Sequence, residues 1–305
     1  MSELLNHAFV TPKERNLYRR VAQGYTGAGR VVDAGCFAGG TTTALCEGIE
    51  GSHEAPPVIA IDRFIVADPY IAAYFAQSGM DIRMGDSFLP IFLSNIKQHL
   101  DLVEVRAGDI FSISRIDQPI EILSIDIAKS ASINSYLIAR WFPLLVPGAS
   151  KLIHQDFYAP SQPWLAASMA LLIEYFRILE PKVGESACFQ LDRPIPASAI
   201  QTAASLDWRT TAGVNAFEQL EEALGDPYNR SIRIMKAKAL LRQGRQSEAQ
   251  RIVEGLCELE PIYEDEKWMQ WLGMALATIH PSMFSSKQLI AQLYDDDIRF
   301  RLGHW

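Results

Sequence analysis

The 305-residue sequence has few cysteines and no dense run of basic residues. Its four cysteines lack CxxC spacing, so they indicate neither a disulfide framework nor a zinc site, and we expect reduced, mostly buried thiols. The formal net charge of -8 gives no general attraction to phosphate backbones, which argues against nucleic acid as a partner. The cysteines are Cys36, Cys46, Cys188 and Cys257.

Long apolar stretches are also missing. No uncharged apolar run reaches the roughly 18 residues of a membrane-spanning helix. The first residues, MSELLNHAFVTPKER, lack the basic start and apolar core of a signal peptide. We therefore expect a cytoplasmic protein with no membrane partner. A hydrophobic fraction of 49% and a charged fraction of 21% are typical of a folded globular chain.

Short apolar runs that end near an acidic residue alternate with helical stretches along the first two thirds of the chain. This alternation predicts an α/β fold with a Rossmann-like, doubly wound, mostly parallel sheet, which binds ligands at the carboxyl ends of its strands. A capping box at Thr11 and Glu14 predicts a helix to about Gln23, and another is expected over Ile133–Phe142. The predicted strands are Arg30–Ala34, Val58–Asp62, Leu102–Asp109, Ile120–Asp126 and Lys151–Asp156.

Strand-like runs give way to helical ones after about Trp208. We therefore predict an α/β domain over 1–210 and an all-helical C-terminal domain over 211–305, with helices over Glu264–Thr278 and Ser285–Asp297 in the latter. Within it, six residues resemble a tetratricopeptide repeat by their spacing: Ala237, Leu240, Gly244, Ala249, Val253 and Pro261. One such hairpin cannot bury its own apolar face. It packs on other helices, on the α/β domain or on another subunit, or it binds a partner protein.

The segment VVDAGCFAGGTTTAL places glycines between a predicted strand and a predicted helix. Gly35, Gly39 and Gly40 let the backbone turn tightly and approach a ligand. Asp33 lies two residues before the first glycine, and a nearby carboxylate suits a cationic sulfonium better than a phosphate. A tight turn that binds no ligand is the alternative interpretation.

This loop resembles the first motif of class I S-adenosylmethionine-dependent methyltransferases. The GG followed by threonine is similar, more narrowly, to the macrocin-type O-methyltransferases, and the resemblance covers roughly residues 28 to 160. It implies the class I methyltransferase fold and S-adenosylmethionine as cofactor. One departure is Phe37, where many methyltransferases have a second glycine. The residues that would hold the cofactor here are Asp33, Gly35, Phe37, Gly39, Gly40 and Thr41.

Two later acidic residues extend the expected cofactor site. Asp62, followed by Arg63, ends the second strand, where a carboxylate can accept hydrogen bonds from ribose hydroxyls. Dehydrogenases use such an acid for NAD, but their GxGxxG loop does not fit Phe37. Asp109, followed by Ile110, matches the place where methyltransferases hold the adenine amino group, or else it caps the next helix.

The expected reacting end follows the fourth and fifth strands, where Asp126 and Lys129 stand in IDIAKS and His154 and Asp156 in HQDF. This pattern resembles metal-dependent O-methyltransferases of the catechol type. The resemblance implies Asp126 and Asp156 as magnesium ligands, Asp126 also beside the cofactor, and Lys129 as general base. Phe157 replaces the asparagine of the catechol type, so without a metal His154 is the alternative base.

These patterns predict O-methylation of a hydroxyl on a small molecule, such as a sugar or a glycosylated metabolite, with N-methylation left open. Two other functions stay open at this point. One is a non-catalytic module that binds a partner protein through its helical tail. The other is a nicotinamide-dependent oxidoreductase. A homo-oligomer built through the helical region is also compatible with the sequence.

Overall fold

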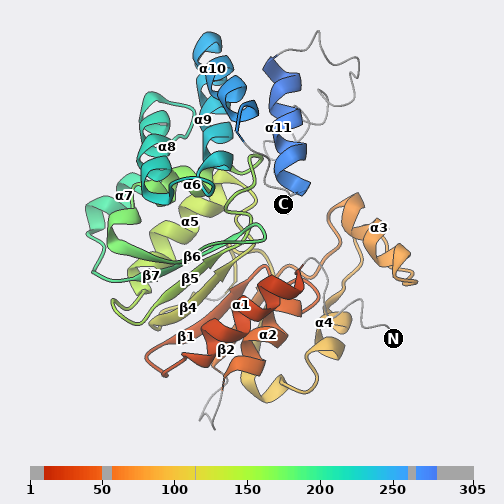
Figure 1. The fold of residues 1–305 in the computed structure, drawn as a ribbon. Coiled ribbons are helices and arrows are strands. Elements are labelled where there is room, and N and C mark those ends of the chain that lie inside the picture. Colours follow the sequence, from red (N-terminus) through yellow and green to blue (C-terminus); the bar gives the residue numbers. More distant parts are fainter. Residues whose placement is uncertain (1–9, 50–56, 114, 260–265, 280–305) are drawn as a thin grey trace. The chain divides into compact units, whose positions relative to one another are not determined.

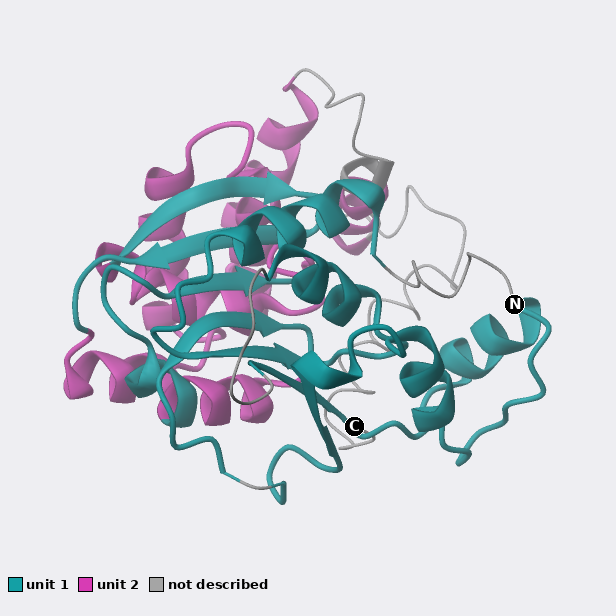
Figure 2. Ribbon diagram, turned by 90° about the horizontal axis from the view of Figure 1, so that it is seen from below, with its two compact units in different colours: residues 1–128, 140–155, 176–194 teal, residues 129–139, 156–175, 195–305 magenta. Residues whose placement is uncertain are grey.

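The computed structural model describes residues 10–49, 57–113, 115–259 and 266–279. The chain forms two compact units that interleave along the sequence (Figure 2). Unit 1 comprises residues 1–128, 140–155 and 176–194, and unit 2 comprises residues 129–139, 156–175 and 195–305. A domain boundary near residue 210 stays a prediction.

Unit 1 contains a seven-stranded sheet with the order β3-β2-β1-β4-β5-β7-β6 (Figure 1). Neighbouring strands from β3 to β5 pair in parallel, and β7 pairs antiparallel with both β5 and β6. The predicted α/β class and the mostly parallel sheet are therefore confirmed. The strands are β1 (Arg30–Ala34), β2 (Val58–Asp62), β3 (Val103–Ala107), β4 (Ile120–Ile125), β5 (Lys151–His154), β6 (Phe176–Val183) and β7 (Ser186–Leu191).

The central strands are buried on both faces, which explains why most of their residues are apolar. All six residues of β4 are buried, including Glu121. The Glu121 carboxylate is stabilised there because it accepts hydrogen bonds from the backbone amides of Thr26 and Ala28, both at 2.6 Å. The segment before β1 is thereby fixed to the neighbouring strand.

The first helix begins as its sequence predicts. Thr11 accepts a hydrogen bond from the Glu14 amide, and the Glu14 carboxylate accepts one from the Thr11 amide at 2.9 Å. Helices α1 and α2 contact each other, and α2 contacts β2 while α1 contacts β6 (Figure 1). Unit 1 contains α1 (Pro12–Gln23), α2 (Gly40–Gly48), α3 (Pro69–Gln77), α4 (Leu89–Asn95) and the 3-10 helices η2 (Leu100–Leu102) and η3 (Phe142–Leu144).

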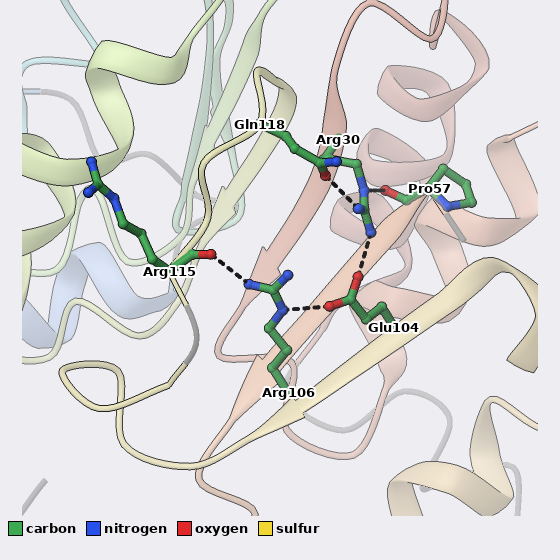
Figure 3. Close-up of polar contacts among 6 residues, drawn as sticks. All are labelled: Arg30, Pro57, Glu104, Arg106, Arg115 and Gln118. Atoms are coloured by element: carbon green, nitrogen blue, oxygen red, sulfur yellow. Dashed lines mark hydrogen bonds and ion pairs between the residues drawn. The ribbon is translucent and has the colours of Figure 1, made fainter. Parts of the chain in front are cut away.

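Strand β3 forms one edge of the sheet, and charged side chains lie along it (Figure 3). Glu104 accepts a hydrogen bond from Arg106 at 2.7 Å and another from Arg30, at the start of β1, at 2.9 Å. Arg30 also contacts the carbonyl oxygen of Pro57 and the side chain of Gln118. These contacts connect the edge strand to β1 across β2.

Unit 2 is helical. Its helices α9 and α10 meet at Gly244, whose φ of 75° suits glycine, and Ala237 and Ala249 are buried between helices. Predicted positions Pro261 and Ser285–Asp297 lie outside the described residues. The helices are α6 (Pro163–Ala170), η4 (Ile173–Tyr175), α7 (Ala197–Ala204), α8 (Thr211–Leu224), α9 (Arg230–Arg242), α10 (Gln246–Cys257), α11 (Glu266–Ile279) and all but the end of α5 (Ala131–Trp141).

The cysteines are free thiols. Cys36, Cys46 and Cys188 are buried as expected, whereas Cys257 is exposed. No helix among the described residues is both long enough and apolar enough to cross a membrane.

Candidate functional site

The loop between β1 and α2 is the centre of the candidate site. Gly35 has a φ of 91°, and a Cβ atom there would lie 2.8 Å from the carbonyl carbon of Asp126. Only glycine therefore permits the close approach of this loop to the end of β4. Gly39, with a φ of 90°, is the N-cap of α2 and provides no side-chain hydrogen bond to the helix.

Asp33 lies beneath this loop and is 1% exposed. Its Oδ2 accepts hydrogen bonds from the hydroxyls of Thr41 at 2.8 Å and Thr42 at 2.6 Å. Burial raises the pKa of Asp33, and the two threonine hydrogen bonds counteract part of this rise. The carboxylate thus connects β1 to the first turn of α2, and a direct contact with a cofactor stays a prediction.

Asp62, at the end of β2, binds the same loop. Its Oδ2 accepts a hydrogen bond from the Phe37 amide at 3.0 Å, and its Oδ1 accepts one from the Phe64 amide at 2.9 Å. Burial raises the pKa of Asp62, and these backbone amides oppose the rise. The side chain is partly exposed, and a carboxylate has about four acceptor sites, so it can accept further hydrogen bonds.

Phe37 adopts a φ of 45°, the left-handed region in which glycine is favoured. The ring packs among aromatic side chains that follow β2 in the sequence, with centroid distances of 5.9 Å to Tyr74, 5.5 Å to Phe75 and 5.2 Å to Phe88. This packing explains how the bulky Phe37 is accommodated at a position where the methyltransferases that the loop resembles often have glycine. The backbone keeps a glycine-like conformation, and the aromatic contacts stabilise it.

Asp126 and Asp109 follow two other strands of the sheet. Asp126 comes directly after β4, and its amide donates to the carbonyl oxygen of Ala34 at 2.8 Å. Asp109 comes two residues after the end of β3, and its Oδ1 accepts a hydrogen bond from the Phe111 amide at 2.9 Å. Asp109 therefore caps a turn, whereas its alternative interpretation expected a helix there, and Ile110 is buried.

The predicted reacting residues of unit 2 form one cluster. Lys129 is ion-paired with Oδ2 of Asp156, and the Gln162 amide donates to the same oxygen at 2.8 Å. Asp156 has a φ of 56°, which places its backbone in the left-handed region. Side-chain exposures of 25% for Lys129 and 24% for Asp156 leave the pair partly accessible.

His154, the alternative base, is the last residue of β5 and is only 2% exposed. The next residue, Gln155, belongs to a buried hydrogen-bond network that the sequence did not reveal. The Tyr18 hydroxyl, from α1, donates to Oε1 of Gln155 at 3.0 Å and accepts a hydrogen bond from the Ser124 hydroxyl at 3.4 Å. Burial raises the pKa of Tyr18 well above its usual value, so the hydroxyl stays neutral.

The aromatic side chains of Tyr158 and Trp164 follow β5, where they could line an acceptor pocket or pack in the fold. Tyr158 is 0% exposed and Trp164 is 5% exposed, which favours packing. Thr42 and Tyr18 are site neighbours that were not predicted from the sequence. The contact of Thr42 with the site could have been inferred from its position in the first turn of the predicted helix. No local sequence pattern indicates that Tyr18 lies near the site.

The two units divide the predicted site residues. Unit 1 contains the predicted cofactor residues of β1, β2 and β3 together with Asp126, whereas unit 2 contains Lys129 and Asp156. The exposed Arg63 follows Asp62. Among the residues that the structure describes, no group of three or more histidine, cysteine, aspartate or glutamate side chains could hold a metal ion. Magnesium binding by Asp126 and Asp156 stays a prediction.

Sequence comparisons add no family assignment. No protein-family model matches the chain, and no curated protein matches it either.

Proposed function

We propose that this protein is an S-adenosylmethionine-dependent methyltransferase that acts on a hydroxyl group of a small molecule. The observation that carries the proposal is the Asp62 carboxylate, which holds the glycine-containing loop through the Phe37 amide and can accept more hydrogen bonds. A ligand with two adjacent hydroxyls, such as a ribose, satisfies this acceptor.

The sheet order supports the same conclusion. Its parallel part, β3-β2-β1-β4-β5, is the order of doubly wound nucleotide-binding sheets. The antiparallel β7 between β5 and β6 resembles the class I methyltransferase fold and departs from the all-parallel dinucleotide-binding order. We infer a class I methyltransferase fold with an all-helical C-terminal appendage over 211–305.

The first turn of α2 fits the amino-acid end of the cofactor. Because Gly39 supplies no capping side chain, the amides of that turn suit a carboxylate ligand. Asp62 would hold the ribose hydroxyls, and Asp109 with Ile110 the adenine. Asp33 would act indirectly, since it holds Thr41 and Thr42 in place. The bound cofactor supplies an electrophilic methyl group.

Deprotonation of the acceptor is assigned to the pair formed by Lys129 and Asp156. The resemblance implies Lys129 as general base, but in an ion pair the lysine carries its proton, so the carboxylate of Asp156 is the group that can accept one from the acceptor hydroxyl. The Lys129 ammonium then offsets the negative charge that develops on the acceptor oxygen. Gln162 keeps Asp156 oriented through its 2.8 Å hydrogen bond.

The test is calorimetric titration of the full chain with S-adenosylhomocysteine, with and without magnesium. We expect micromolar binding that Asp62→Ala weakens at least tenfold, about 1.4 kcal/mol. Asp81→Ala removes an exposed carboxylate that contacts Arg83, and it should leave binding unchanged. Absence of binding, or NADH binding in its place, would refute the proposal. A non-catalytic module would bind the ligand and turn over no acceptor.

A further inference from the structure

Unit 2 contains a cavity of about 460 Å³ among helices α9, α10 and α11. All the described residues that line it belong to unit 2, and none of these is assigned to methyl transfer. The volume falls within the range of about 300–1,000 Å³ that is usual for small-molecule sites. The cavity is therefore a second candidate site of the chain.

Helix α9 forms one wall of the cavity with an apolar stripe. Ile234, Ala237 and Leu241 line the cavity at spacings of three and four residues, which place them on one face of the helix. Ile234 is 5% exposed and Ala237 is 2% exposed, so this stripe is directed away from solvent.

Helix α11 forms a second wall in the same way. Trp271, Ala275 and Ile279 recur every four residues along it, and the buried Val253 of α10 also lines the cavity. Ala275 and Ala237 each present only a methyl group. This leaves a space among the helices that larger apolar side chains would fill.

Polar side chains lie at the exposed part of the lining. Gln246 of α10 and Gln270 of α11 are exposed, whereas Val253, further along α10, is buried. The cavity thus has an apolar interior and a polar margin. Lys238 connects α9 to the loop segment in the lining, because its Nζ donates a hydrogen bond to the carbonyl oxygen of Pro160 at 3.4 Å.

We propose that this cavity binds a small molecule with a hydrocarbon or aromatic body and an oxygen-bearing polar end. The body lies against the apolar stripes of α9 and α11, where removal of apolar surface from water is the main source of affinity. The polar end stays at the margin, where the side-chain amides of Gln246 and Gln270 can donate hydrogen bonds to it. This site does not depend on the proposed methyl transfer.

The test is calorimetric titration of the full chain with 1-hexanol, 1-octanol and 1-decanol, each below its solubility limit. Because the apolar body supplies the affinity, we expect each pair of added methylene groups to tighten binding about tenfold. The probes are uncharged, so general charge attraction makes no contribution to their binding. Absence of decanol binding, or equal affinity for hexanol and decanol, would overturn the proposal.

Variants that fill the cavity locate the site. Ala275→Leu should weaken decanol binding at least tenfold and keep or raise the unfolding temperature, because leucine occupies apolar space. Ala76→Leu is the matched control, since Ala76 is exposed on α3 of unit 1, and it should leave binding unchanged.

If Ala275→Leu loses helix content, Thr278→Leu provides a second filled variant about one turn along the same face of α11. Decanol binding that persists unchanged in a folded filled variant, or that Ala76→Leu weakens equally, would show that the alcohol binds elsewhere and that the proposal is wrong.

Discussion

The Phe37 amide donates a hydrogen bond to the Asp62 carboxylate across 25 residues of sequence, and this bond joins the loop after β1 to the end of β2. The strained backbone of Phe37 is therefore bonded directly to Asp62, the residue proposed to bind the ribose. Changes in the loop are therefore expected to affect the conformation of the Asp62 side chain.

Gly35→Ala should destabilise the fold strongly, by about 2–4 kcal/mol, because it combines left-handed strain with overlap against the Asp126 backbone. Gly27→Ala is the matched control, since Gly27 has a φ of 83° and no heavy atom within 4 Å of its would-be Cβ. We expect a cost of about 1 kcal/mol there. Urea denaturation of both variants measures the difference, and equal losses would contradict the close approach.

Phe37→Gly should be more stable than Phe37→Ala by about 1 kcal/mol, because only alanine retains the cost of a positive φ. Both variants lose the ring contacts with Phe75 and Phe88, so both should be less stable than the parent, Phe37→Gly by about 2 kcal/mol and Phe37→Ala by about 3 kcal/mol. Thermal and urea unfolding provide the comparison. If alanine proves the more stable, the left-handed conformation of Phe37 is not maintained in solution.

Asp33→Asn should change how stability depends on pH. Because the folded-state pKa of Asp33 is raised, the folded protein holds this proton more tightly than the unfolded chain. The free energy of unfolding therefore falls as pH rises from about 3.9, the usual aspartate value, through the raised folded pKa.

Asparagine lacks this titration, and its side-chain oxygen can still accept from Thr41 and Thr42, which both donate to one oxygen of Asp33. We expect a flatter pH profile than that of the parent between pH 4 and 7, measured by urea unfolding. Asp81→Asn, which removes an exposed carboxylate, serves as control. An unchanged profile in Asp33→Asn would show that burial of Asp33 is not accompanied by a raised pKa.

Lys129→Met should lower turnover at least 100-fold, the usual range for a group that assists proton transfer. Binding of S-adenosylhomocysteine should stay within threefold of the parent, because Lys129 is outside the cofactor loop. The assay follows release of S-adenosylhomocysteine with whichever sugar or phenol of a hydroxylated panel is methylated. Lys236→Met breaks a different ion pair of unit 2, with Glu221, and should retain turnover. Full activity in Lys129→Met would show that the ion pair of Lys129 with Asp156 takes no part in proton transfer.

Much of the parallel sheet could be predicted because its strands are buried on both faces. Strands such as β2 then begin with four consecutive apolar residues that stand out in the sequence. The β6–β7 hairpin was not predicted. Its β6 strand is an edge in which only Phe176 is buried, and it includes Arg177 and Glu180, so its apolar signal is weak.

The candidate site was predictable only where the signal is local. The glycines of the β1–α2 loop and Asp62 follow recognisable strand ends. The hydrogen bond between Tyr18 and Gln155 joins residues 137 positions apart, and no periodic pattern in the sequence predicts it. The engagement of Asp33 with Thr41 and Thr42 depends on how the helix is oriented on the sheet, which the sequence alone does not specify.

The charged row along β3 has a consequence for how copies of the chain encounter one another. An uncovered edge strand offers unpaired backbone groups to any other extended segment, and this is a common route to fibrillar assembly. If a second copy of the chain paired along this edge, Glu104 and Arg106 would lie against the same residues of that copy or would lose contact with water. Replacing both by valine should preserve the sheet yet promote precipitation at high protein concentration.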